Sequence, residues 1–195
     1  YESTARTGDA EAATAILTEA LEALPESPDL LWAKAGELEQ GGDVNGAIEI
    51  YQALYDRLPN SPIIANNLAS LLSVHFDEPE TIDRAYAIAR RLRGSDVPAF
   101  QDTYGWLAHL RGQTEEAVEH LEAAANALPT EPLVQYHLGM AYSAAERPKA
   151  AINRLTNAIE LFGEADTWPQ VAIATAEIER LEKVVAELEA EENGN

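Results

Sequence analysis

Residues 132–163 read PLVQYHLGMAYSAAERPKAAINRLTNAIELFG, and their pattern is the clearest indication of the secondary structure. A proline opens it, apolar residues recur three and four positions apart, and a polar break at residues 145–148 divides it into two halves. Apolar residues at this spacing form one face of an α-helix. The stretch therefore predicts two amphipathic helices joined by a short turn.

The same pattern returns along the chain at a spacing of about 34 residues. Such a period is typical of proteins in which each helix pair buries its apolar face only by stacking on its neighbours. Glycine suits the left-handed end of a helix, proline suits a first helical turn, and no segment alternates like a strand. The sequence therefore predicts an all-α repeat fold. Its markers are Pro28, Pro62, Pro98 and Pro132, which are 34, 36 and 34 residues apart, with Ala13, Ala47, Ala85, Ala117 and Ala151, and the turn glycines Gly41, Gly42 and Gly112.

This repeat resembles the tetratricopeptide repeat (TPR), which carries Trp-x2-Leu-Gly-x2-Tyr on its first helix and Ala, a large apolar residue, Ala and then Pro after it. The resemblance implies a right-handed superhelical solenoid of helix-turn-helix repeats over residues 1–163, with about 4.5 repeats. The register puts Tyr1 midway along a first helix, so we expect a truncated first repeat and further repeats upstream. The best match consists of Gln135, Leu138, Gly139, Tyr142, Ala151, Leu155 and Ala158, with Gln135 at the Trp position and Gly163 at the Pro position.

The period stops after Gly163, and residues 164–195 predict a long helix with an acidic tail. Asp166 or Thr167 is a suitable cap, and Trp168-Pro169 is a suitable start. One interpretation is a capping helix that covers the end of the array. The alternative is that its overhanging end, 181–188, forms a coiled-coil seam in a weak homodimer.

Composition excludes several classes of protein. The chain has 34 acidic and 13 basic side chains and a formal charge of −21, which argues against nucleic-acid binding because phosphates require a Lys/Arg surface. Its apolar runs are far shorter than the ~18 residues of a membrane span. Cysteine is absent, the four histidines lack metal-ligand spacing, and no phosphate-binding loop is found. We therefore expect no enzyme, no cofactor, no metal site and no direct membrane insertion.

The resemblance also indicates where a partner would bind, since fixed positions on the first helices of TPR proteins line a concave groove. Aromatic and methionine side chains there are useful anchors. The alternative is that Trp32, Trp106 and Tyr136 pack against neighbouring repeats. The candidates by register are Trp32, Asn66, Asn67, Ser70, Asp102, Trp106, His109, Tyr136, Met140 and Ser143.

One local reversal of charge occurs in the middle of the acidic chain. Four arginines follow one another on the second helix of the central repeat, and either they pair within the chain or they form a convex basic patch for an acidic partner. They are Arg84, Arg90, Arg91 and Arg93.

Together these features predict a protein–protein interaction scaffold that binds a peptide or a helical segment. The alternative is a regulatory or oligomerisation arm of a larger enzyme or export complex, with catalysis elsewhere. The segments 66–69 and 102–106 are similar to those of TPR proteins in bacterial envelope and exopolysaccharide export systems, including those that accompany PEP-CTERM/exosortase sorting. This similarity implies a bacterial protein of the periplasm or cell envelope, with the cytoplasm as the alternative.

Overall fold

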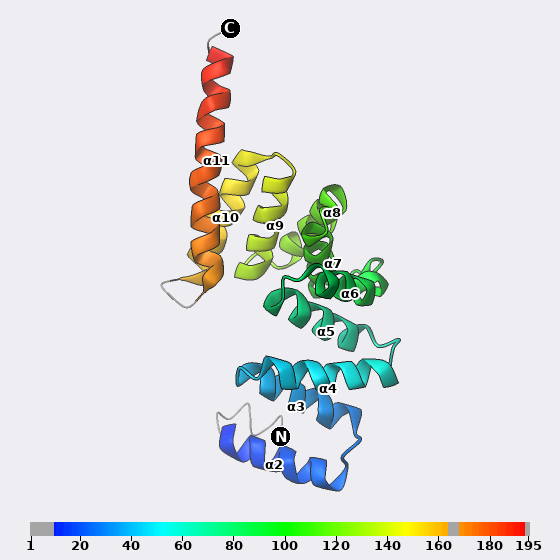
Figure 1. Cartoon of the computed structure of the whole chain (residues 1–195). Helices are drawn as coiled ribbons and strands as arrows, with labels where there is room; N and C mark the ends of the chain where they lie inside the picture. Colours follow the sequence, from blue (N-terminus) through cyan, green and yellow to red (C-terminus); the bar gives the residue numbers. More distant parts are fainter. Residues whose placement is uncertain (1–9, 164–167, 194–195) are drawn as a thin grey trace. The chain divides into compact units, whose positions relative to one another are not determined.

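Helices and turns make up the part of the chain that the computed structural model describes, residues 10–163 and 168–193 (Figure 1). No strand occurs in these two ranges, which confirms the predicted all-α helical-repeat fold. The elements are α2 (Ala10–Ala23), α3 (Pro28–Gln40), α4 (Val44–Arg57), α5 (Pro62–His75), α6 (Pro79–Ala89), the 3-10 turn η1 (Arg90–Leu92), α7 (Pro98–Leu110), α8 (Thr114–Ala127), α9 (Pro132–Ala144), α10 (Pro148–Phe162) and α11 (Pro169–Asn193).

Proline and glycine begin and end the helices where the sequence predicts. The four prolines of the 34-residue period open α3, α5, α7 and α9, where a missing N–H costs nothing because the first turn has no intrahelical acceptor. Gly42 (φ 82°) and Gly112 (φ 72°) have the left-handed conformation between paired helices. In the first of these turns Asp43 then caps α4, its Oδ1 accepting a hydrogen bond from the Gly46 N–H (3.0 Å).

The turn between α9 and α10 has a glutamate, not a glycine, in the left-handed conformation. Glu146 lies 34 residues after Gly112, yet it has φ 56° and carries a side chain in the left-handed region. Backbone bonds close the turn, since the Arg147 N–H donates to the Tyr142 carbonyl (2.9 Å). A non-glycine residue in this conformation costs about 1–2 kcal/mol.

Replacing Glu146 by glycine is therefore expected to raise the free energy of unfolding by about 0.5–1 kcal/mol, because relief of strain exceeds the greater chain entropy of glycine. Urea denaturation measures the change. The matched control is Gly112→Ala, which puts a side chain into the same conformation and should lower stability. If both changes shift stability in the same direction, the strain argument is wrong.

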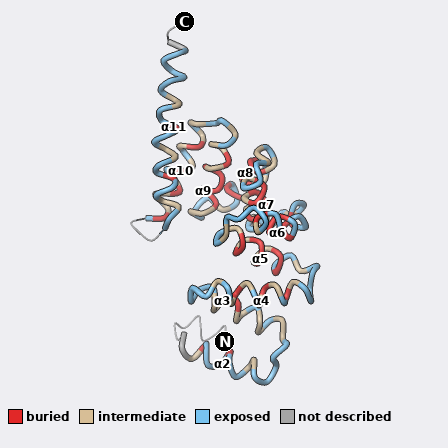
Figure 2. Tube along the Cα trace, viewed as in Figure 1, coloured by how far each residue is buried: buried red, intermediate tan, exposed pale blue. Residues whose placement is uncertain are grey.

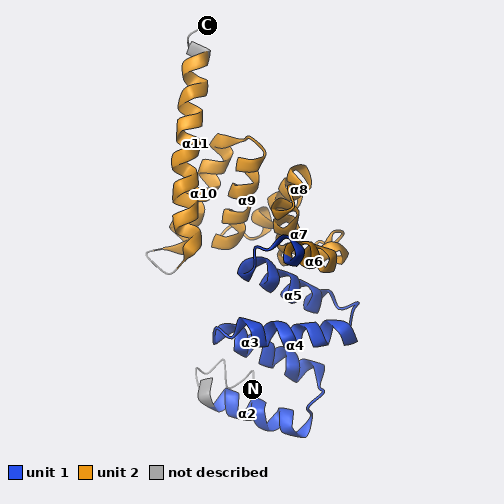
Figure 3. Cartoon of the chain, in the orientation of Figure 1, with its two compact units in different colours: residues 1–81 blue, residues 82–195 orange. Residues whose placement is uncertain are grey.

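The helices fall into two units, residues 1–81 and 82–195 (Figure 3). In the first unit α2 packs on α3, α3 on α4, and α4 on α5. In the second unit the same sequential packing joins α7, α8, α9, α10 and α11. Buried residues alternate with exposed ones along these helices, as expected for amphipathic helices that stack one on the next (Figure 2).

Close helix contacts within the second unit depend on glycine. A Cβ atom added to Gly139 of α9 would lie 2.6 Å from Leu155 Cδ2 of α10, and one added to Gly105 of α7 would lie 2.8 Å from Leu121 Cγ of α8. Neither distance is compatible with normal packing. These two glycines therefore set the separation of the paired helices.

Gln135, which occupies the Trp position of the repeat, is fully buried. Its amide nitrogen donates to the carbonyls of Leu128 (3.3 Å) and Ala125 (3.4 Å), and its oxygen accepts from Arg154 Nη1 (2.8 Å). A buried amide is tolerated only when it is hydrogen-bonded. Gln135 thus replaces the apolar contacts of a tryptophan with bonds that connect α8, α9 and α10.

Helix α11 covers the apolar faces of the last helix pair. Ala174 and Leu181 are buried in one cluster with Tyr136, Leu155 and other side chains of α9 and α10. Near the end of α11, Glu189 still pairs with Lys149 at the start of α10 (2.7 Å). The capping interpretation stays a prediction, and its proposed cap residues 166 and 167 lie outside the described residues.

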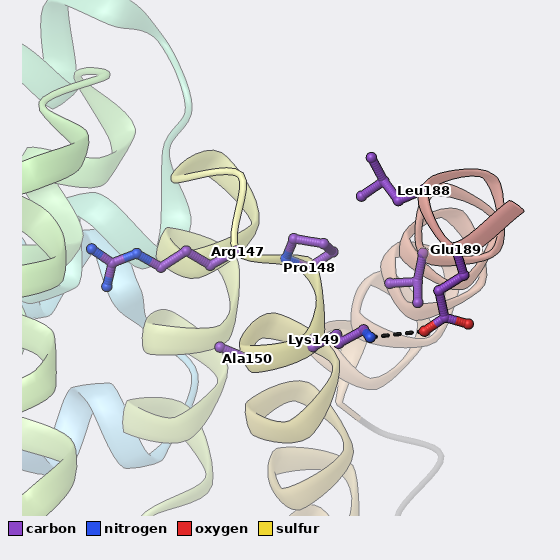
Figure 4. Close-up of a pocket in the computed structure, with 7 residues that line it drawn as sticks. Arg147, Pro148, Lys149, Ala150, Leu188 and Glu189 are labelled. Carbon is purple, nitrogen blue, oxygen red and sulfur yellow. Dashed lines mark hydrogen bonds and ion pairs between the residues drawn. The ribbon is translucent and has the colours of Figure 1, made fainter. Parts of the chain in front are cut away.

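A hollow of about 330 Å³ separates the end of α11 from the start of α10. Figure 4 shows Lys149 and Glu189 pointing toward one another beside it, with Leu188 at its edge and Arg147 pointing away. Leu188, the last residue of the predicted seam, is 49% exposed, whereas Leu181 is buried. Within the predicted seam, Leu188 thus exposes apolar surface to solvent and Leu181 does not, and the weak homodimer stays a prediction.

Candidate partner-binding surfaces

The unit 1 surface consists of the predicted residues Trp32, Asn66, Asn67 and Ser70, carried by the first helices α3 and α5. Trp32 is 40% exposed although it is one of the largest side chains of the chain. In the amide orientation that satisfies both of its polar atoms, Asn67 accepts hydrogen bonds from Trp32 Nε1 (3.0 Å) and from the Tyr51 hydroxyl (3.3 Å). One edge of the indole is therefore fixed, while much of the ring stays accessible.

The two other residues of this surface are half-buried. The side-chain oxygen of Asn66 is buried and has no hydrogen-bond partner. The backbone carbonyl of Ser70 accepts a bond from Ser73 Oγ (2.9 Å). A buried polar atom that lacks a partner costs free energy, and the Asn66 oxygen is such an atom.

A small apolar hollow of about 290 Å³ adjoins Trp32. Leu58 (40% exposed) and Ile63 (53% exposed) join Trp32 around it, and Asp29 and Ser61 provide polar groups. The register of the repeat pointed to Trp32 but not to Leu58, Ile63 or Asp29. Leu58 belongs to the loop after α4, whose conformation the helical pattern does not define.

The unit 2 surface consists of the predicted residues Asp102, Trp106, His109, Tyr136, Met140 and Ser143 on α7 and α9. Here Trp106 is half-buried in a cluster of rings. The ring of His137 stacks on it with centroids 4.2 Å apart, that of His109 with centroids 5.0 Å apart, and that of Tyr136 is tilted at 5.9 Å. Much of the surface of Trp106 is thus used within the chain.

The two histidines beside Trp106 have different environments. His137 is buried, and its Nδ1 lies 2.9 Å from Asp102 Oδ1, which gives the ring a carboxylate partner. His109 Nδ1 is buried without a hydrogen-bond partner. Burial first, and the neighbouring His137 second, lower the pKa of His109 to about 4, so this ring is neutral at pH 7.

The remaining residues of the unit 2 surface contact α11 or the cluster beneath it. Tyr136 is 5% exposed, and burial raises the pKa of its hydroxyl. Ser143 donates to a carboxylate oxygen of Glu177 and accepts from Arg180 (3.0 Å). The hydrogen bond from Arg180 is the main reason that the pKa of Glu177 is lowered. Tyr136 therefore packs within the chain, as the alternative interpretation expects. The Ser143 hydroxyl is hydrogen-bonded to side chains of α11.

The arginine cluster is exposed, and part of its charge is used within the chain. Arg93 pairs with Glu116 (2.8 Å), which also accepts a hydrogen bond from the Tyr104 hydroxyl (2.9 Å). The hydroxyls of Tyr104 and Tyr86 are 3.1 Å apart. Arg93 therefore ends a polar chain that runs into the core, while Arg84, Arg90 and Arg91 are on the exposed side of α6 and η1.

The described residues, 10–163 and 168–193, lack two kinds of feature. No group of three or more His, Cys, Asp or Glu side chains in these ranges could hold a metal ion. No helix among them has the length and apolar composition required to cross a membrane.

Known proteins resemble this chain in structure rather than in sequence. No family model matches it, and no curated protein does. The TPR protein TTC0263 of Thermus thermophilus is similar with a TM-score of 0.61 and 19% identity, over 90% of this chain and 94% of that one. PilW, a type IV pilus biogenesis factor, is similar with a TM-score of 0.65 and 18% identity, over 97% of this chain and 89% of that one. YrrB, a TPR protein with an unusual peptide-binding site, is similar with a TM-score of 0.59 and 15% identity, over 89% of this chain and 88% of that one. The chain therefore has the tetratricopeptide repeat fold.

Proposed function

We propose that the chain is a protein-interaction scaffold that binds a peptide or a helical segment through the first helices of its repeats. The observation that carries the proposal is Trp32, a large aromatic side chain that is 40% exposed beside an apolar hollow and held by Asn67. Exposed aromatic residues in such settings are frequent anchors of protein interfaces. The peptide-binding site named for YrrB supports the proposal by analogy of fold.

The surfaces of the two units contribute differently under this proposal. The unit 1 surface offers an exposed indole, whereas the unit 2 surface is largely engaged with its own histidines and with α11. We therefore place the main anchor in unit 1. No catalytic role is proposed for His109, because its neutral ring is packed against Trp106.

Replacing Trp32 by alanine is expected to weaken capture of native partners by about tenfold or more, because the anchor is lost while the core stays intact. The measurement is affinity capture from a lysate of the source organism, with circular dichroism to check helicity. Trp168→Ala is the matched control, since Trp168 is 42% exposed but lies next to α11 in the other unit. If the wild type, the control and the variant retain the same proteins in the same amounts, the proposal is wrong.

A further inference from the structure

The hollow beside Trp32 has a size and lining that limit what can occupy it. Three large apolar side chains, Trp32, Leu58 and Ile63, are at least 40% exposed around a space of about 290 Å³. Sites for drug-sized ligands have about 300–1,000 Å³, so this one is at the lower limit and suits a single side chain. Exposed apolar groups gathered at one place indicate a contact with another molecule.

The lining is fixed before any partner arrives. The hydrogen bond from Trp32 Nε1 to Asn67 holds the indole, and Asn67 is in turn bonded to the Tyr51 hydroxyl and the Ile63 carbonyl. Pro28 and Ile64 complete the lining from the first turns of α3 and α5. A preformed apolar site loses little conformational entropy on binding, which favours affinity.

The negative charge around the hollow favours a partner segment with positive charge. Residues 10–81 contain 13 acidic side chains and 2 basic ones. Both basic groups have acceptors within the chain, because Lys34 pairs with Glu37 (2.6 Å) and Arg57 donates to the Glu26 carbonyl (2.9 Å). Asp29 lines the hollow itself and is exposed. A strongly negative surface attracts cations and repels acidic segments.

From these observations we propose that the hollow binds one large apolar side chain of a partner segment that has Lys or Arg next to it. The apolar side chain enters between Trp32 and Ile63, and the basic group lies near Asp29. This inference rests on the proposed function, to which it adds the chemical class of the partner and the place where its anchor binds.

A random-peptide library displayed on phage tests the proposal when it is selected against the whole immobilised chain. The expected result is enrichment of peptides in which Leu, Ile, Met, Phe or Trp stands beside Lys or Arg. One enriched peptide, labelled with fluorescein, is then titrated with each variant. Trp32→Ala and Ile63→Ser should weaken binding about tenfold, and Trp168→Ala should leave it unchanged. Asp29→Ser should weaken it less and reduce its dependence on salt.

Three results would overturn the inference: no enriched peptide, enriched peptides without a basic residue, or an affinity that Trp32→Ala and Ile63→Ser both leave unchanged. Ile63 is 53% exposed, so its replacement tests the hollow without disturbing the core. A further variant, Ser70→Arg on α5, separates this inference from the proposed function. If only Ser70→Arg lowers the affinity, the hollow is not the anchor site, but the proposed scaffold function stands. If none of these substitutions changes the affinity, both proposals are wrong.

Discussion

Replacing Gly139 by alanine is expected to lower the free energy of unfolding by about 1–3 kcal/mol, the usual cost of overfilling a packed contact. The added Cβ would be 2.6 Å from Leu155 Cδ2, 2.7 Å from Leu155 Cγ and 3.1 Å from the Leu155 backbone nitrogen. Leu155 is fully buried, so its side chain can move only by displacing its neighbours. Urea denaturation followed by circular dichroism measures the loss.

The control for this prediction is the same substitution at Gly36. A Cβ added there meets nothing within 4 Å, and Gly36 lies inside α3. Alanine is favoured over glycine within a helix by about 1 kcal/mol, so Gly36→Ala should stabilise the protein. Stabilisation by Gly139→Ala as well would show that α9 and α10 do not approach each other as closely as described.

Acidification from pH 6.5 to pH 4 is expected to remove about 2–3 kcal/mol of stability through His109 alone. The folded pKa of His109 is about 4, below its ordinary 6.5, mainly because the ring is buried. Between these two values the unfolded chain binds a proton that the folded chain does not, so stability falls as the pH falls. Well below pH 4 both states are protonated, and this contribution does not change further.

The variant His109→Phe isolates this effect, since it keeps a ring beside Trp106 and removes the titrating group. Other acid-sensitive groups are common to both proteins and cancel in the difference, including Glu37 and Glu177, whose pKa values are lowered by hydrogen bonds from Lys34 and Arg180 respectively. Denaturation curves at several pH values should show a steeper loss for the wild type between pH 6.5 and 4. Equal losses of stability in the wild type and in His109→Phe would mean that the pKa of His109 is not lowered in the folded state.

Much of the fold could be predicted from the sequence because its information is local and repeated. Pro28, Gly42 and Gly112 have the conformations that their positions in the period require. Glu146 could not be predicted to adopt the left-handed conformation, because the residue type disfavours it and the backbone hydrogen bonds that close the turn do not depend on the side chain at that position. Gln135 likewise fits its buried position through partners on the neighbouring helices, with Arg154 of α10 donating to its oxygen and carbonyls at the end of α8 accepting from its nitrogen.

The candidate site was predictable only in part. The register gives Trp32, Trp106 and Tyr136 the same predicted role as groove anchors. In the structure, Trp32 is exposed, Trp106 is half-buried and Tyr136 is buried. The difference arises from neighbours that a single repeat does not reveal, namely the rings of His109 and His137 around Trp106 and the packing of α11 beside Tyr136. The hollow was not predicted, because its lining combines two helix starts and a loop.

If partners bind to the first helices of the repeats, site-specific photo-crosslinking in cells of the source organism should detect them at those helices. A photoreactive phenylalanine analogue placed at Trp32 or Ser70, on α3 and α5, should crosslink to another protein. The same analogue at the exposed residues Ala53 and Ala123, on the second helices α4 and α8, should not. We expect crosslinks confined to Trp32 and Ser70, whereas crosslinks confined to Ala53 and Ala123 would show that partners bind to the second helices instead.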